Sequence, residues 1–139
     1  MATSEDDVTT TGQSAPIRTG AEYIESLRGR NLKIYLFGEL VEEPVEHPVI
    51  RPSINAIAET YDLAARNPEL GTALSPYTGE RINRFLHIAE SPEDLVMQNK
   101  MQRRLGQDTG TCFQRCVGMD AINAIATAQM MKAGANRGA

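Results

Sequence analysis

The chain has 139 residues, 41% of them hydrophobic, which is enough for one modest domain with a packed core. Its formal net charge of −4 offers no basic surface for a nucleic acid partner. No apolar run approaches the roughly 18 residues of a membrane span, and the N-terminus lacks the apolar segment of a signal peptide. We therefore expect a cytoplasmic protein that binds neither nucleic acids nor membranes.

The N-terminal region predicts a polar tail followed by a short helix. Residues 1–18 contain almost nothing apolar, so they cannot bury enough surface to offset the entropy of ordering and are expected to be flexible. Thr19 is a candidate N-cap for a helix through Arg28, and Gly29 is typical of its end. The predicted domain therefore begins at residue 19.

Two further elements follow before the middle of the chain. Residues 32–41 are rich in Ile, Leu, Tyr, Phe and Val around a Gly38-Glu39 turn, which indicates a short β-hairpin or an extended segment. Residues 47–66 have apolar side chains at helical spacing, and Asn67-Pro68 stops that helix. A two-stranded hairpin is marginal alone, so it is expected to lie against another part of the protein.

Weaker patterns follow, and then a well-capped helix. Residues 71–79 are expected to form a loop, and residues 82–88 a short helical or extended piece. Ser91 is a candidate N-cap that precedes a proline and two acidic residues, an arrangement typical of a helix start. That helix is predicted to end at Leu105, with an interruption at residues 106–110.

The last predicted helix covers residues 111–133, and residues 134–139 are expected to be a flexible tail. The helix is rich in Ala, Ile and Met and carries few charges, so it should be buried on most sides. A domain of this size offers little protein to cover it, and the missing cover is expected from another chain. The predicted fold is mainly α over residues 19–133. One broad helix face would hold Cys116, Met119, Ile122, Asn123, Ala126 and Met130.

The only two cysteines, Cys112 and Cys116, are four residues apart. On one helix their Cβ atoms would be about 5–6 Å apart, whereas a disulfide needs about 3.5–4.5 Å. Two thiolates on one zinc ion must also lie close together, so an iron-sulfur cluster fits the spacing better. Such a cluster normally takes four ligands, so two would have to come from elsewhere. The alternative, two ordinary buried thiols, stays open.

Neighbouring polar residues could contribute to such a site. If residues 106–110 break the helix, Cys112 lies in the first turn of the next one, where free amides stabilise a thiolate. Gln114 and Arg115 could hydrogen-bond a substrate or a sulfide, or could make solvent or interface contacts. Arg103 and Gln107 would share a face of the preceding helix, and Arg103 could anchor a carbonyl or carboxylate or remain a surface charge.

The rest of the sequence does not contain a complete active site. His47 and His87 have no second histidine or carboxylate at ligand spacing, so both are expected to be structural or surface residues. There is no phosphate-binding glycine loop, nucleophile elbow or His-Glu-x-x-His motif. The cysteine pair is therefore the main candidate for chemistry.

Several blocks of sequence stand out in one order and spacing. They are residues 23–28 (YIESLR), 35–39 (YLFGE), 47–55 (HPVIRPSIN), 100–107 (KMQRRLGQ) and 112–121 (CFQRCVGMDA). Together these blocks resemble the N-terminal region of the 4-hydroxybutyryl-CoA dehydratase (vinylacetyl-CoA Δ-isomerase) family. That family shares a superfamily with the flavin-dependent 4-hydroxyphenylacetate 3-hydroxylases, which lack the cluster, so Cys112 and Cys116 favour the dehydratase branch.

The resemblance implies a fold and a set of site residues. It implies the helical N-terminal domain of an acyl-CoA dehydrogenase-like fold, with a β domain and a C-terminal helical bundle absent from this chain. Cys112 and Cys116 match two of the four ligands of a 4Fe-4S cluster, and FAD is held mostly by the later domains. Arg103 matches an active-site arginine and Gln114 a polar residue beside the cluster, which favours catalytic roles for both.

The resemblance also implies a function and a partner. Family members are several times longer, so the chain is expected to be the small subunit of a split dehydratase, inactive alone, or else a truncated product. A larger subunit would supply the other domains, cluster ligands and catalytic base within a higher-order hetero-oligomer. The expected reaction is radical elimination of water from a hydroxyacyl substrate, a CoA thioester being one candidate. The alternatives are a subunit of a flavin-dependent aromatic hydroxylase and a non-catalytic structural subunit.

Overall fold

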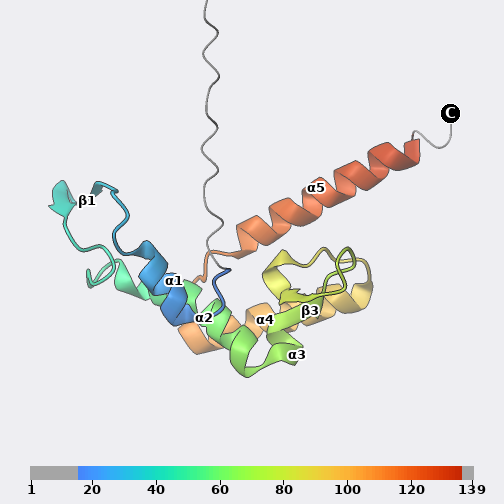
Figure 1. Cartoon of the computed structure of the whole chain (residues 1–139), viewed down its shortest axis with the longest axis horizontal. Helices are drawn as coiled ribbons and strands as arrows, with labels where there is room; N and C mark the ends of the chain where they lie inside the picture. The colour runs from blue at the N-terminus through green and yellow to red at the C-terminus, as the bar shows by residue number, and fades with distance from the viewer. Residues whose placement is uncertain (1–15, 136–139) are drawn as a thin grey trace, which may run out of the picture.

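The structure, a computed structural model, describes residues 16–135 (Figure 1). This part of the chain is mainly helical with two small antiparallel hairpins, which confirms the predicted fold class. The two flexible tails were predicted at residues 1–18 and 134–139. Most of these residues lie outside the described part of the chain, so the flexibility of the tails stays a prediction. The elements are α1 (Gly20–Leu27), β1 (Ile34–Leu36), β2 (Glu39–Val41), α2 (Arg51–Arg66), α3 (Pro68–Gly71), β3 (Thr72–Leu74), β4 (Arg81–Asn83), the 3-10 helix η1 (Arg84–Leu86), α4 (Pro92–Thr109) and α5 (Cys116–Ala135).

Helix α1 begins where its capping residue predicts. The Thr19 hydroxyl accepts a hydrogen bond from the Glu22 amide at 3.1 Å, and the Glu22 carboxylate accepts one from the Thr19 amide at 3.2 Å. This reciprocal pair satisfies amides that a helix start leaves free. The Tyr23 and Tyr61 rings stack with centroids 5.5 Å apart, which packs α1 against α2.

The first hairpin forms as predicted, but its turn lies one residue earlier than expected. Ile34 pairs with Val41 and Leu36 with Glu39, so Phe37 and Gly38 form the two-residue turn. Both have positive φ, 54° and 88°, which is the backbone conformation of a type I′ turn. The hairpin extends away from the helices that form the body of the molecule (Figure 1).

Helix α2 begins at Arg51 rather than at the predicted His47, because residues 44–50 form successive turns. The Arg51 amide donates to the His47 carbonyl at 2.8 Å, and the proline that follows Arg51 occupies the first helical turn. The predicted end is confirmed, since Asn67 is the C-cap. The buried face of α2 consists of Ile54, Ala56, Ala58, Thr60 and Leu63.

The predicted loop over residues 71–79 is wrong, because this segment contains β3. Thr72 pairs with Asn83 and Leu74 with Arg81 across a second hairpin. Three-residue strands are too short to produce a period-2 pattern, so this pairing left no clear sequence signal. Residues 82–88, expected to be helical or extended, divide between β4 and η1.

Helices α4 and α5 differ from their predicted bounds where they meet. The predicted N-cap Ser91 is confirmed, but α4 runs through Gly106 to Thr109 and ends at Gly110, which has a left-handed φ of 61°. The predicted break over residues 106–110 is therefore wrong. Helix α5 begins at Cys116, five residues later than expected, and ends at Ala135, two residues later.

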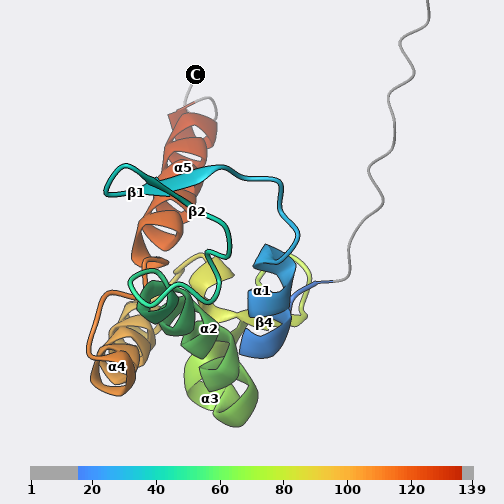
Figure 2. The same ribbon diagram turned by 90° about the vertical axis from the view of Figure 1, so that its left-hand side faces the viewer.

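The core lies where α2, α4, η1 and the start of α5 meet. Beyond this contact α5 leaves the body of the molecule, as both views show (Figures 1 and 2). Much of its apolar surface is exposed in the described part of the chain, so the expected burial on most sides is not reached here. No helix among residues 16–135 is both long and apolar enough for a membrane span. The core side chains are Ala56, Leu63, Phe85, Met101, Leu105, Phe113 and Met119.

Candidate functional site

The two cysteines lie on either side of the point where α5 starts. Cys112 is in the connector, which we define as residues 110–115, and Cys116 is the first residue of α5. The predictions that both thiols share one helix face, and that Cys112 lies in a first helical turn, are therefore wrong. The physical reason is that Gly110 and Gln114 both adopt left-handed backbone conformations, with φ of 61° and 56°. Neither residue continues a right-handed helix.

Side chains of the connector alternate between the core and the exterior. Phe113 is buried and meets Phe85 edge to face, with ring centroids 5.6 Å apart. Cys112 and Gln114 are exposed, while Cys116 is half-buried and packs against the core. The connector therefore holds one thiol and one amide side chain outward, with the second thiol at the edge of the core.

Arg115 turns inward and attaches the connector to α2. Its Nη1 donates to the Thr60 hydroxyl at 2.8 Å, and its guanidinium carbon lies 4.7 Å from the Tyr61 ring centroid and 4.8 Å from that of Phe85. Burial lowers the pKa of Arg115, and the nearby Tyr61 and Tyr23 only partly offset this. The sequence predicted that Arg115 contacts solvent or a substrate, and did not predict its contacts with Thr60 and the two rings.

Gln114 lies between these two inward anchors in a strained conformation. A left-handed backbone is uncommon outside glycine and costs free energy, so the surrounding structure must impose it. Here the flanking residues Phe113 and Arg115 both contact the buried ring of Phe85. The strain at Gln114 is thus a consequence of fixing the connector on both sides.

Arg103 and Gln107 lie on one exposed face of α4, as expected for a helix that reaches Gln107. No carboxylate among the described residues lies within ion-pair distance of Arg103. Its neighbour Arg104 instead donates to Asp108 at 2.8 Å. The Arg103 guanidinium is therefore open to groups outside the described chain.

The described residues supply only part of the donor set of the cluster that the resemblance implies. Across residues 16–135, no three His, Cys, Asp or Glu side chains converge as a metal site would require. An exposed and a half-buried thiol four residues apart fit two ligand positions of a four-ligand cluster. The histidines are used elsewhere: His47 Nδ1 accepts from the Val49 amide at 3.2 Å, and His87 Nε2 lies 3.2 Å from Asp94.

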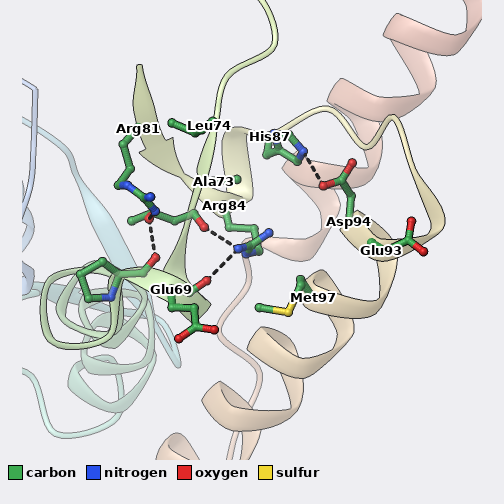
Figure 3. A pocket seen from close by; sticks show the side chains of 11 residues that line it. Glu69, Ala73, Leu74, Arg81, Arg84, His87, Glu93, Asp94 and Met97 are labelled. Atoms are coloured by element: carbon green, nitrogen blue, oxygen red, sulfur yellow. Dashed lines mark hydrogen bonds and ion pairs between the residues drawn. The ribbon is translucent and has the colours of Figure 1, made fainter. Parts of the chain in front are cut away.

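A hollow of about 660 Å³ lies between β3, η1 and the first turns of α4, lined in part by His87 and Asp94 and by no residue of the connector (Figure 3). The Arg84 side chain at its base donates to the carbonyls of Leu70 at 2.8 Å, Glu69 at 2.9 Å and Thr72 at 2.5 Å. Arg84 thereby ties η1 to the end of α3, and the adjacent Phe85 supports the connector. Sequence reasoning missed Arg84, because nothing local indicates that its partners are carbonyls 12–15 residues earlier.

The order of the helices and of the two small hairpins defines the structural class of the domain. They form a helical N-terminal domain of the acyl-CoA dehydrogenase-like fold. Residues 19–138 match the family described as "4-hydroxyphenylacetate 3-hydroxylase N terminal". The chain belongs to this family.

Within this family the chain is similar to dehydratases and to hydroxylases. It is 52% identical over 111 residues to the 4-hydroxybutyryl-CoA dehydratase/vinylacetyl-CoA Δ-isomerase of Clostridium aminobutyricum, covering 78% of this chain and 23% of that protein. A solved oxygen-tolerant archaeal 4-hydroxybutyryl-CoA dehydratase from N. maritimus superposes with a TM-score of 0.79 at 66% identity, covering 89% of this chain and 25% of that one.

The hydroxylases are more distant. The oxygenase component of 4-hydroxyphenylacetate 3-monooxygenase from Thermus thermophilus is 34% identical over 117 residues, covering 80% of this chain and 23% of that protein. A solved oxygenase component of this kind, in complex with FAD and 4-hydroxyphenylacetate, superposes with a TM-score of 0.55 at 34% identity, covering 66% of this chain and 19% of that one. The chain spans about a quarter of the length of its dehydratase relatives.

Proposed function

We propose that the chain is the N-terminal part of an FAD- and iron-sulfur-dependent dehydratase that resembles 4-hydroxybutyryl-CoA dehydratase. The observation that carries this proposal is the identity of 52% and 66% to two dehydratases, against 34% to the two hydroxylases compared above. The reaction would be elimination of water from a hydroxyacyl substrate. A CoA thioester is the favoured substrate because both dehydratase relatives are named for one.

Cys112 and Cys116 are the proposed ligands of a 4Fe-4S cluster. Their placement supports this role, because the anchored connector leaves one thiol exposed and the other at the core edge. The other two ligands would come from residues outside this chain. When bound, the cluster would supply Lewis acid chemistry at the hydroxyl group that leaves.

Arg103 and Gln114 are proposed to face the substrate. Arg103 is exposed on α4 and has no carboxylate partner among the described residues. A guanidinium group can hold a carbonyl or carboxylate oxygen through directed hydrogen bonds. Gln114 is held outward between the two cysteines, where its amide could orient a polar substrate group. Both roles concern binding and orientation and require no proton transfer by this chain.

The remaining domains are proposed to hold most of the FAD and to complete the site. The FAD assignment is supported by a related oxygenase component solved with FAD. A separate larger subunit and a hetero-oligomer stay predictions. Affinity purification of the tagged protein from its native host would test them, with co-purification of a chain that carries the β and C-terminal helical domains as the expected result.

The cluster assignment predicts the behaviour of two serine variants. In the assembled protein, Cys112→Ser and Cys116→Ser should each lower bound iron and abolish dehydratase activity, because a hydroxyl is a poor replacement for a thiolate ligand. Iron per protein and turnover of 4-hydroxybutyryl-CoA are the measurements. Thr111→Ser, an exposed neighbour in the connector, is the matched control and should change neither. Full iron content in both cysteine variants would contradict the assignment.

A flavin-dependent hydroxylase is the second candidate, favoured by the family match and by the solved oxygenase component. It predicts hydroxylation of a phenolic substrate by reduced flavin and oxygen, with no requirement for iron. Product analysis of the assembled protein under air, with 4-hydroxyphenylacetate as the probe, distinguishes the two. A hydroxylated product that persists in Cys112→Ser would favour this candidate over the dehydratase.

A further inference from the structure

Arg115 carries a positive charge that the described part of the chain does not balance. No carboxylate among residues 16–135 lies within ion-pair distance of its guanidinium. The groups around it are the Thr60 hydroxyl and the rings of Tyr61 and Phe85, all of them neutral. Arg115 is half-buried, so its charge is only partly solvated, and an opposite charge is the most favourable further partner for it.

The neutral contacts compensate for only part of this requirement. Two aromatic faces within 5 Å attract the guanidinium, but they carry no net charge. Of the five guanidinium N–H groups, one donates to Thr60. Arg115 is therefore well placed by this environment but incompletely neutralised by it.

A candidate source of the opposite charge lies in the same short segment as Arg115. The residue directly precedes Cys116 and follows Cys112 by three positions, so it belongs to the segment that presents both thiols. Cysteine ligands of a metal cluster are thiolates, and reduction potentials of such clusters depend on net charge and on nearby hydrogen bonds. An anionic thiolate cluster at this segment would supply the missing charge.

We propose that Arg115 is a positioning residue that fixes the ligand connector through Thr60 and provides the counter-charge for the cluster bound at Cys112 and Cys116. This inference rests on the proposed function. Through its anchor, Arg115 holds the strained Gln114 outward and keeps Cys116 at the edge of the core. Through its charge, it stabilises the more negative, reduced state of the cluster.

Two substitutions separate these roles in the assembled, iron-loaded protein. Arg115→Met removes both the anchor and the charge, so iron affinity should fall about 10- to 100-fold, as for other residues that support metal ligands, and the cluster midpoint potential should become more negative. Thr60→Val removes the hydrogen bond that anchors Arg115 and keeps the charge and the ring contacts, so it should accelerate iron release to a chelator with little change in potential. Arg115→Lys keeps the charge and should restore the potential.

The matched control is Arg104→Met, which removes an exposed arginine of α4 and should change neither iron release nor potential. Circular dichroism of each variant checks that the helices are retained. A wild-type potential in Arg115→Met would overturn the counter-charge role. Wild-type iron release in both Arg115→Met and Thr60→Val would overturn the positioning role.

Thiol labelling distinguishes failure of this inference from failure of the proposed function. If the assembled wild-type protein holds no iron, the proposed cluster and the counter-charge role both fail. The positioning role is then decided by iodoacetamide labelling of the same protein. Thr60→Val should raise the labelling rate of half-buried Cys116 toward that of exposed Cys112, and an unchanged ratio of the two rates would overturn it.

Discussion

Arg84 and Arg115 both turn their guanidinium groups into the protein, and they satisfy them in different ways. Arg84 donates to three backbone carbonyls, whereas Arg115 has one hydroxyl and two aromatic rings. Burial lowers the pKa of each. Arg84 completes the end of a short helix, while Arg115 retains N–H groups for a further partner.

At the residue scale, we expect Arg84→Met to destabilise the protein. The change removes the donor of three carbonyls near β3, two of them in the half-buried residues Leu70 and Thr72, and an unsatisfied carbonyl that is shielded from water costs about 1–3 kcal/mol. The free energy of unfolding from urea denaturation is the measurement. Arg81→Met is the matched control: Arg81 is exposed and donates to the Thr72 hydroxyl at 2.8 Å, so its loss should cost about 0.5 kcal/mol or less. Equal losses in the two variants would show that the carbonyl contacts contribute little.

At the scale of elements, the helices are delimited by local capping groups. Asp94 illustrates this at the start of α4: its carboxylate accepts hydrogen bonds from the amides of Glu90 and Ser91 at 3.0 Å and from the Ser91 hydroxyl at 2.9 Å. It also lies 3.2 Å from the buried His87 ring. One side chain therefore joins the cap of α4 to the segment that follows η1.

Asp94 predicts a pH dependence of stability. Burial raises the pKa of this carboxyl, but the hydrogen bonds from Glu90, Ser91 and His87 outweigh it and hold the pKa below its ordinary value of 3.8. A depressed folded-state pKa contributes stability that is present above pH 3.8 and is lost as the pH falls through the folded-state value.

The corresponding experiment is thermal unfolding between pH 7 and pH 3. Asp94→Asn should lower Tm at pH 7, and the difference from the wild type should shrink as the pH falls below about 4. Glu93→Gln, an exposed neighbour in the same helical turn, is the control for a general effect of charge near the helix start. A Tm difference for Asp94→Asn that stays constant across this range would contradict the role of its ionised form.

At the scale of the whole molecule, α5 is incompletely covered by the described chain. Met119 is buried in the core and Asn123 Oδ1 accepts from the Ala89 amide at 2.9 Å, which attaches this part of α5 to the body. Beyond that contact Ile125 and Met131 are 60% and 71% exposed. Large apolar side chains on one helix mark a surface that another part of a protein covers.

This exposed surface predicts how α5 variants assemble. Ile125→Gln combined with Met131→Gln should leave the helical content of this domain unchanged, because both side chains lie outside its core, and should weaken its association with the remaining domains. Each apolar side chain buried in that association is worth about 1.5–3 kcal/mol. The assembled fraction on size-exclusion chromatography is the measurement, with Gln129→Ala as the control at an exposed polar position of α5. Unchanged assembly of the double variant would contradict this assignment of α5.

Residues close in sequence allowed several features to be predicted correctly. Thr19 and Ser91 cap their helices through partners three residues away, so the pattern that predicts them is local. The two ends of the connector were not predictable in this way. Gly106 and Gly110 are equally suited to end a helix. Helix α4 passes the first of them, and Asp108 beyond it pairs with Arg66 of α2 at 3.1 Å and with Arg104 at 2.8 Å.

The sequence by itself determined the mainly helical fold, the helix caps and the cysteine pair, because these depend on periodicity and on residues a few positions apart. Only the tertiary structure decided how the pair is presented. Arg115 meets Thr60, a residue 55 positions earlier, and Phe113 meets Phe85. These long-range contacts impose the left-handed backbone at Gln114 and place Cys112 outside the helix that begins at Cys116. Their free energy comes from packing and desolvation, which no local pattern encodes.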